Sequence, residues 1–204
     1  APRWGLHLEQ NRIPNIHVKV TCNLEKLSDW SILGDWIGKQ VLPDWKLPWG
    51  PMPLIEGLPE HASFASKKAL TAAAANYGTP MLWASGHSSD PPLSKNSDGD
   101  WMAPEGGWQG ELVFGEQELE SRYQDLAPKG KVDLIVIGCP QASVEEIRRT
   151  ASAVRSYAEM GQKIPDERLW VFTSQANFDL ASSDGSIDIL EDSGAVVLRD
   201  TCPE

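Results

Sequence analysis

The sequence predicts an α/β protein built on a mostly parallel sheet with helical crossovers. Segments rich in β-branched residues alternate with segments whose apolar residues recur at helical spacing, and this alternation implies parallel strands joined by helices. Residues 134–137 form an unbroken apolar run, typical of a parallel strand that is covered on both faces. The chain has 204 residues, of which 41% are hydrophobic, enough for one sizeable core or two small domains.

The first half of the chain contains three predicted strands and three predicted helices. We expect strands over 15–22, 79–85 and 111–115, and helices over 24–41, 61–77 and 116–126. The Ala-rich helix ends at Gly78, a residue favoured just after a helix. Between these elements, 42–59 is rich in Pro and Trp and is expected to be irregular. Residues 86–110 form a polar loop long enough to suggest a functional segment, a lid or disorder.

The second half repeats the alternation with clearer boundaries. We expect strands over 133–139, 168–174 and 195–202, and helices over 143–160, 175–183 and 186–194. Gly138 lets the chain turn after the first of these strands, and Pro140 suits the first turn of a helix. Ser143 and Glu146 have the spacing of a capping box, which marks the start of the next helix.

Charge and cysteine content restrict the possible partners and compartment. The formal net charge of −11 argues against nucleic acid and anionic membranes as partners. No apolar stretch reaches the roughly 20 residues of a membrane span. The first ten residues lack the hydrophobic core of a signal peptide. Three cysteines are a sparse, odd set that favours a reducing compartment, so we expect a cytoplasmic protein.

Two of the predicted strands finish at a cysteine, Cys139 and Cys202. Because parallel strands end at the same edge of a sheet, these thiols could meet in space although 63 positions separate them. Thiolates at strand ends suit ligation of iron–sulfur clusters or metals. The alternative is that both are ordinary packed cysteines, because Cys is among the most buried residue types. For Cys22, at the end of the first strand, packing is the better interpretation.

Several polar residues at element ends could hold an anionic ligand. Lys68 lies in an otherwise small-residue helix and could direct its ammonium at a substrate, although surface lysines are usually only solvated. Ser88 and Asp90 follow a predicted strand and could bind a carboxylate or phosphate, or simply begin a loop. Thr173 and Ser174 stand at a helix N-terminus, which can bind an anion or be capped by the side chain alone.

Taken together, these segments resemble the catalytic domain of the aconitase X family. The resemblance rests on "GLHLEQNRIPNIHVKV", "KALTAAAANYG", "SGHSSD", "DLIVIGCPQASVEEI", "LWVFTSQ" and "VVLRDTC", in the family's order. These motifs span nearly the whole chain. The "GCP" followed by "SVEE" and the "DTC" ending are the more specific of them, whereas the Ala-rich stretch is weak alone.

The resemblance implies an aconitase-like architecture and a hydro-lyase that dehydrates a small anionic hydroxy acid. Known members act on cis-3-hydroxy-L-proline or mevalonate 5-phosphate. The resemblance also implies an iron or iron–sulfur centre held by three cysteines, of which Cys139 and Cys202 match two. An iron with an open position would polarise the leaving hydroxyl as a Lewis acid while a base removes the neighbouring proton. The candidate catalytic residues are Lys68, Ser88 and Asp90; the candidate substrate-binding residues are Thr173, Ser174 and Gln141.

The sequence also departs from the family pattern. Gln141 and Trp83 stand where the family commonly has His, and Asp90 replaces a Glu. We expect residues 1–204 to be the second half of one catalytic domain, with a possible sub-boundary in 86–110. The N-terminal half and the small swivelling domain would belong to the same or another chain, so the chain alone is expected to be inactive. Two alternatives remain: a diverged, non-catalytic domain, or an α/β module that binds small molecules and has two buried thiols.

Overall fold

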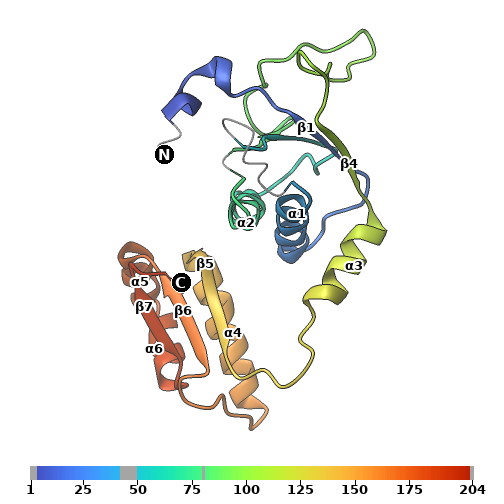
Figure 1. Ribbon diagram of the computed structural model, residues 1–204. Coiled ribbons are helices and arrows are strands. Elements are labelled where there is room, and N and C mark those ends of the chain that lie inside the picture. The colour runs from blue at the N-terminus through green and yellow to red at the C-terminus, as the bar shows by residue number, and fades with distance from the viewer. Residues whose placement is uncertain (1–3, 42–49, 80, 203–204) are drawn as a thin grey trace. The chain divides into compact units, whose positions relative to one another are not determined.

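The chain folds as two compact units that meet at residues 127 and 128. The computed structural model describes residues 4–41, 50–79 and 81–202, and Figure 1 shows the elements of both units. Each unit has its own parallel sheet and its own hydrophobic core. Residues 86–110, where the sequence suggested a possible sub-boundary, lie inside the first unit.

The first unit contains a four-stranded parallel sheet in the order β3-β2-β1-β4. Its strands are β1 (Ile16–Val20), β2 (Pro53–Glu56), β3 (Trp83–Ala84) and β4 (Gly110–Phe114). Three of them lie where the alternation predicts a strand, although β3 is shorter than expected. Strand β2 falls in the Pro- and Trp-rich segment that was expected to be irregular, so that expectation is wrong for 53–56; residues 42–49 lie outside the described residues.

One face of this sheet packs against helices α1 (Leu27–Gln40), α2 (Phe64–Ala75) and α3 (Glu116–Leu126). Val18, Ile55 and Phe114 are fully buried in this core. Helices α1 and α2 lie side by side (Figure 1) and approach very closely at Gly34, where a Cβ atom would lie 2.2 Å from the Leu70 carbonyl oxygen. The absence of a side chain at Gly34 therefore permits this packing.

A buried ion pair connects α1 to α3. Arg122 is buried and its Nε contacts the carboxylate of Asp35, while its Nη1 lies 3.2 Å from Asp125 Oδ2. The Tyr77 hydroxyl donates to Asp35 Oδ1 at 2.9 Å. Donation to this carboxylate raises the pKa of Tyr77, and the carboxylate also raises the pKa of Arg122. The network keeps the buried guanidinium charged and partnered.

The other face of the first sheet is covered partly by the long loop 86–109. Trp101 is buried against Leu54 and Trp83, and Trp108 stacks on His17 with ring centroids 5.0 Å apart. His17 is buried on the central strand and its Nε2 contacts the Glu56 carboxylate. The loop is therefore a packed cover over this face, at least where its tryptophans lie.

The second unit contains a three-stranded parallel sheet in the order β5-β6-β7. Its elements are β5 (Ile135–Ala142), α4 (Val144–Glu159), β6 (Leu169–Thr173), α5 (Gln175–Ser182), α6 (Ser186–Asp192) and β7 (Val196–Arg199). The core brings all three helices against Leu169 and Val171 of the middle strand. The predicted capping box is confirmed, because Ser143 Oγ accepts from Glu146 N at 3.3 Å and Glu146 Oε2 accepts from Ser143 N at 2.8 Å.

The expectation that the strand over 133–139 is covered on both faces is wrong. Leu134, Ile135 and Val136 are 40%, 50% and 43% exposed. The strand is at the edge of its sheet, and the helices pack on the face that includes Val171. Val136 pairs with Trp170, on the opposite face. A continuous apolar run therefore does not here indicate a doubly covered strand.

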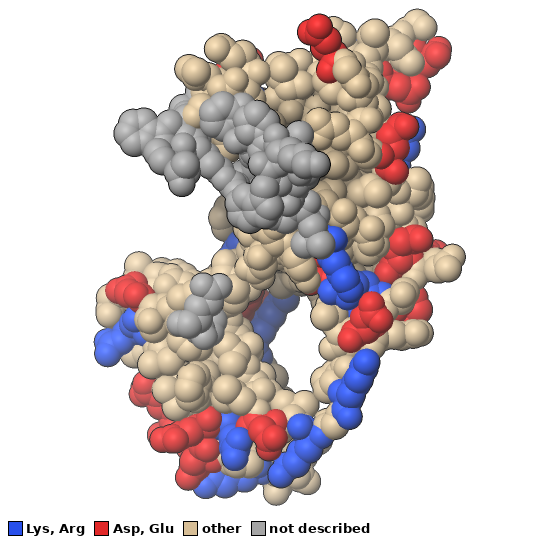
Figure 2. Space-filling model, in the orientation of Figure 1, with Lys and Arg blue, Asp and Glu red and all other residues tan. Residues whose placement is uncertain are grey.

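The described helices and the surface bear on the expected partners. None of the helices within the described ranges is long and apolar enough to cross a membrane. On the face drawn in Figure 2, Lys and Arg lie in small groups interspersed with Asp and Glu.

Candidate functional site

The carboxyl ends of β5, β6 and β7 bring together most of the residues that the sequence singled out in the second unit. Cys139 and Gln141 lie in the last part of β5, Thr173 ends β6, and Cys202 follows β7 by three residues. Because β5 and β7 both pair in parallel with β6, these residues lie together at the carboxyl end of one sheet, an end that we call the cysteine edge. The predicted convergence of the two cysteine-bearing segments on one sheet edge is therefore observed.

A bulge at the end of β5 shapes this edge. Ile137 pairs with Val171 and Ala142 pairs with Thr173, so residues 138–141 stand opposite the single residue Phe172. Gly138 has φ of +123°, and a Cβ atom there would lie 2.3 Å from the Phe172 carbonyl oxygen. Only glycine fits this close approach, which holds residues 138–141, the turn that carries Cys139, against β6.

The end of β6 anchors the far side of the bulge. The buried Thr173 hydroxyl donates to the Ala142 carbonyl at 2.7 Å, and Asn177 Nδ2 donates to the same carbonyl at 3.1 Å. Ser174 Oγ accepts from Asn177 N at 3.2 Å and so caps α5. In this structure the hydroxyls of Thr173 and Ser174 thus hold the strand end and the helix start in place.

Two further hydrogen bonds fix the segment that carries Cys202. Asp200 N donates to the Thr173 carbonyl at 2.9 Å, and Asp200 Oδ1 accepts from Gln175 N at 2.9 Å. Gln141 Nε2 donates to the carbonyl of Thr201 at 3.1 Å. The bulge of β5 therefore reaches over the end of β6 to the residue directly before Cys202.

The thiols of this edge differ from the third cysteine. Cys139 and Cys202 are exposed, whereas Cys22 is packed in the core of the first unit, as expected, where burial raises its pKa. Two exposed thiols from adjoining segments are chemically suited to be part of the ligand set of an iron centre. Among the described residues there is no group of three or more His, Cys, Asp or Glu that could complete such a set.

The other predicted site residues belong to the first unit. Lys68 is half-buried on α2, and Asp90 is exposed in the loop after β3. The Ser88 hydroxyl folds back on the end of β3, where it accepts from Ala84 N at 3.1 Å and lies 3.1 Å from the Ala84 carbonyl oxygen. Ser88 and Asp90 thus follow the carboxyl end of their strand, as the sequence predicts for an α/β site.

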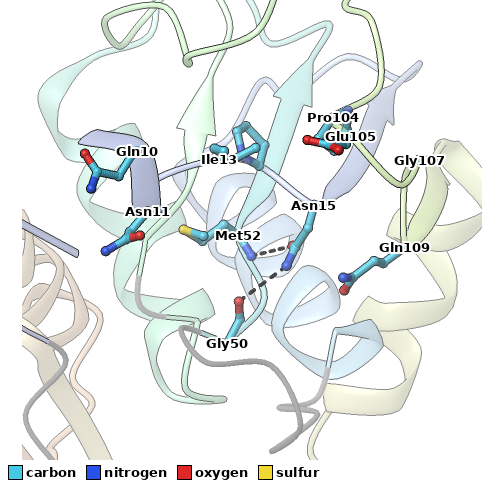
Figure 3. A pocket seen from close by; sticks show the side chains of 11 residues that line it. Gln10, Asn11, Ile13, Asn15, Gly50, Met52, Pro104, Glu105, Gly107 and Gln109 are labelled. Atoms are coloured by element: carbon cyan, nitrogen blue, oxygen red, sulfur yellow. Dashed lines mark hydrogen bonds between the residues drawn. The ribbon is translucent and has the colours of Figure 1, made fainter. Parts of the chain in front are cut away.

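A pocket of about 240 Å³ lies in the first unit, at the end of the sheet opposite to Ser88 and Asp90 (Figure 3). Asn15, Met52 and Gln109 line it and directly precede β1, β2 and β4, so it opens at the amino ends of these strands. Asn15 Oδ1 accepts from Met52 N at 2.9 Å and joins two of the strand ends. None of the predicted site residues lines this pocket.

Sequence reasoning missed the residues that hold the candidate edge together. Asn177 and Asp200 support the bulge and the Cys202 segment, and neither was singled out. Asp200 has φ of +50°, a turn conformation that Asp tolerates better than most residues. An Asp between a strand and a Thr-Cys pair was the available signal for a turn at this position.

The fold of this chain matches that of a solved aconitase X structure. The crystal structure of Thermococcus kodakaraensis aconitase X in its holo form superposes with a TM-score of 0.73 over 99% of this chain and 47% of that chain, at 23% identity. The fold class expected from the alternation and the resemblance is thereby confirmed. Residues 132–204, which comprise nearly all of the second unit, match the aconitase X third domain.

Curated relatives extend this match to both units. The chain is 32% identical over 99% of its length to the phosphomevalonate dehydratase large subunit of Methanothermobacter thermautotrophicus, and 30% identical over 98% of its length to that of Methanosarcina mazei. The similarity to aconitase X proteins therefore covers both units, and the match to the family's third domain covers the second. The chain spans slightly under half of these relatives, 45% and 43% of their lengths.

Proposed function

We propose that this chain is part of a hydro-lyase that dehydrates a small anionic hydroxy acid through a cysteine-ligated iron or iron–sulfur centre. The names of the relatives support a dehydratase. The observation that carries the metal assignment is the convergence of two exposed cysteine segments on one sheet edge, joined by the Gln141–Thr201 hydrogen bond. Buried, separate thiols would have favoured simple packing.

Cys139 and Cys202 are the residues of this chain that would hold the centre, with a third donor from elsewhere. When bound, iron with an open coordination position supplies Lewis acidity toward a hydroxyl group. Thiolate ligation requires both thiols to lose their protons, so binding of the centre would depend on pH and release protons. The exposure of both cysteines leaves room for additional ligands.

The remaining candidates would act on the substrate. We assign proton transfer and substrate activation to Lys68, Ser88 and Asp90 in the first unit. Gln141 and Ser174, half-buried at the cysteine edge of the second unit, would line the substrate site with Thr173 beneath them. The Lys68 ammonium is suited to an anionic substrate because its charge attracts a carboxylate or phosphate.

The complete enzyme would need more than the residues described. The relatives are called large subunits and are about twice as long as the region they share with this chain. We infer that an N-terminal half and a small swivelling domain, in the same or another chain, complete the site. This assignment predicts little or no turnover by residues 1–204 alone.

Replacing Cys139 by Ser in the complete enzyme should abolish binding of the centre. Serine is a poor substitute for a thiolate ligand, so anaerobic reconstitution should leave the variant without iron and without its thiolate-to-iron absorption band. Cys22→Ala is the matched control, because Cys22 is buried in the other core and should leave iron content unchanged. Full iron content in Cys139→Ser would defeat the assignment.

A non-catalytic family member is the second candidate function, and two substitutions favour it. Gln141 and Trp83 occupy positions where the family commonly has His. Trp83 is buried, and its Nε1 donates to the Arg12 carbonyl at 3.0 Å, so it has a structural role. Assays with phosphorylated hydroxy acids and hydroxyproline separate the two candidates, because turnover of any of them excludes a non-catalytic protein. Loading with iron excludes a plain small-molecule-binding module.

A further inference from the structure

We propose that Gln141 is a positioning residue that holds the two cysteine-bearing segments together, so that Cys139 and Cys202 can bind one centre at the same time. The inference rests on the proposed function in that it assigns the two thiols to a common ligand. It goes beyond that function because it gives a specific role to a residue that departs from the family pattern.

The turn that carries Cys139 is fixed at both of its ends without help from Gln141. Gly138 lies against the backbone of Phe172, and the Ala142 carbonyl receives hydrogen bonds from Thr173 and Asn177. Gln141 stands between these two anchors, and it is half-buried. Its backbone is therefore held in place on β6, and its side chain extends from this fixed backbone to the Cys202 segment.

The segment that carries Cys202 has fewer anchors. Strand β7 ends at Arg199, and among the described residues Asp200 is the last with a backbone hydrogen bond to β6, from its N–H to the Thr173 carbonyl. The hydrogen bond from Gln141 Nε2 to the Thr201 carbonyl extends this support by one residue, up to the position next to Cys202. It is a connection between the Cys139 turn and the Cys202 segment that does not pass through β6.

This geometry predicts what loss of the amide would do. Without the Gln141 donor, the Thr201 carbonyl would turn to water, and Cys202 would sample more orientations relative to Cys139. A ligand that must bond both thiols would then have to restrict this freedom itself, so its affinity would fall. The fold should survive, because neither Gln141 nor Thr201 belongs to the hydrophobic core.

Capture of a trivalent arsenical tests the proposal on the thiols themselves. Phenylarsine oxide condenses with two thiols to form two As–S bonds and release one water, so it reports whether two cysteines can be bonded together. We expect one arsenical per chain in the wild type, seen by mass spectrometry, and its loss in Cys139→Ser and in Cys202→Ser. Gln141→Leu should raise the equilibrium constant for transfer of the arsenical from the protein to two molecules of 2-mercaptoethanol two- to tenfold, roughly the effect of one hydrogen bond.

Conservative variants distinguish positioning from a general loss of stability. Gln141→His keeps an N–H donor and should stay within about twofold of the wild type, whereas Gln141→Glu places a carboxylate against the Thr201 carbonyl and should behave like Gln141→Leu. Gln124→Leu is the matched control, since Gln124 is an exposed glutamine of the first unit that donates to Glu120 at 2.9 Å. Thermal unfolding should be unchanged in all four variants.

Two results would overturn the proposal. One is that Gln141→Leu gives up the arsenical to 2-mercaptoethanol as the wild type does, and the other is that the wild-type chain forms no bridged arsenical. Failure of the proposed function has a different signature. If the complete enzyme binds no iron while the arsenical behaves as expected, the dehydratase assignment fails and the positioning role of Gln141 stands.

Discussion

At the scale of single residues, Gly138 sets the position of the cysteine-bearing turn. Its φ of +123° and its closeness to the Phe172 carbonyl exclude any other residue without a shift of one strand against the other. Gly161, at the end of α4, also has positive φ, +74°, but a Cβ atom there would meet nothing within 4 Å. A comparison of alanine substitutions at Gly138 and Gly161 therefore separates the cost of backbone strain from the cost of steric overlap.

Gly138→Ala should cost more stability than Gly161→Ala, as urea unfolding would measure. At Gly161 the substitution brings backbone strain alone, which lowers the free energy of unfolding by about 1–2 kcal/mol. At Gly138 overlap with the β6 backbone adds about 1–3 kcal/mol. Gly138→Ala should also weaken arsenical capture, because the turn must move away from β6. Equal costs for the two variants would argue against the close approach.

At the scale of elements, a charged contact joins α4 to the turn that precedes α6. Arg148 Nε donates to Asp184 Oδ2 at 2.6 Å, and Asp184 Oδ1 accepts from Ser186 Oγ at 2.5 Å and from Ser186 N at 3.1 Å. The hydrogen bond from the Ser186 hydroxyl, followed by that from Arg148, lowers the pKa of Asp184. Asp184 thus stabilises the start of α6 and connects it to the neighbouring helix.

The lowered pKa of Asp184 predicts a pH dependence of stability. Because the folded pKa lies below the unfolded value of about 3.9, the stabilisation is present above that value and is lost as pH falls through the folded pKa. Asp184→Asn should therefore be less stable than the wild type at neutral pH, and the gap should narrow below about pH 4. Urea midpoints between pH 2.5 and 7 measure the gap, and a gap independent of pH would contradict the prediction. Salt should reduce it, because the site is exposed.

At the scale of the whole molecule, each unit has its own core, and the second unit leaves an apolar edge strand in contact with solvent. Leu134, directly before β5, and Ile135 and Val136 in β5 are each at least 40% exposed. Edge strands with exposed apolar side chains are templates for pairing with other chains. In a longer protein the same edge would be available to a neighbouring element.

Val136→Lys should reduce concentration-dependent self-association of the 204-residue chain. A lysine on the edge strand opposes pairing between chains through its charge and its cost of burial. Analytical ultracentrifugation over a range of concentrations measures the effect. Leu126→Lys, at the end of α3, removes an apolar side chain of similar exposure, 50%, from a helix and should change association little. Equal effects would show that overall hydrophobicity matters and the strand edge does not.

Local pattern was sufficient for most of the fold and for part of the site. The helical spacing over 24–41, the capping box at Ser143 and the order of strands and helices all follow from neighbouring residues, and the structure reproduces them. The convergence of the Cys139 and Cys202 segments could also be predicted, since the ends of parallel strands share an edge. The catalytic roles of Lys68, Ser88 and Asp90 stay predictions.

Only the tertiary structure decided how these elements combine. The strands divide between two sheets, β5 lies exposed at an edge, and the Thr173 hydroxyl bonds the Ala142 carbonyl. The Gln141 amide reaches a carbonyl 60 residues further along the chain. Periodicity reports the face that a segment can bury, whereas burial and hydrogen-bond partners depend on residues distant in sequence. That is why the convergence of the two cysteine segments was foreseeable from the sequence and the contacts that support it were not.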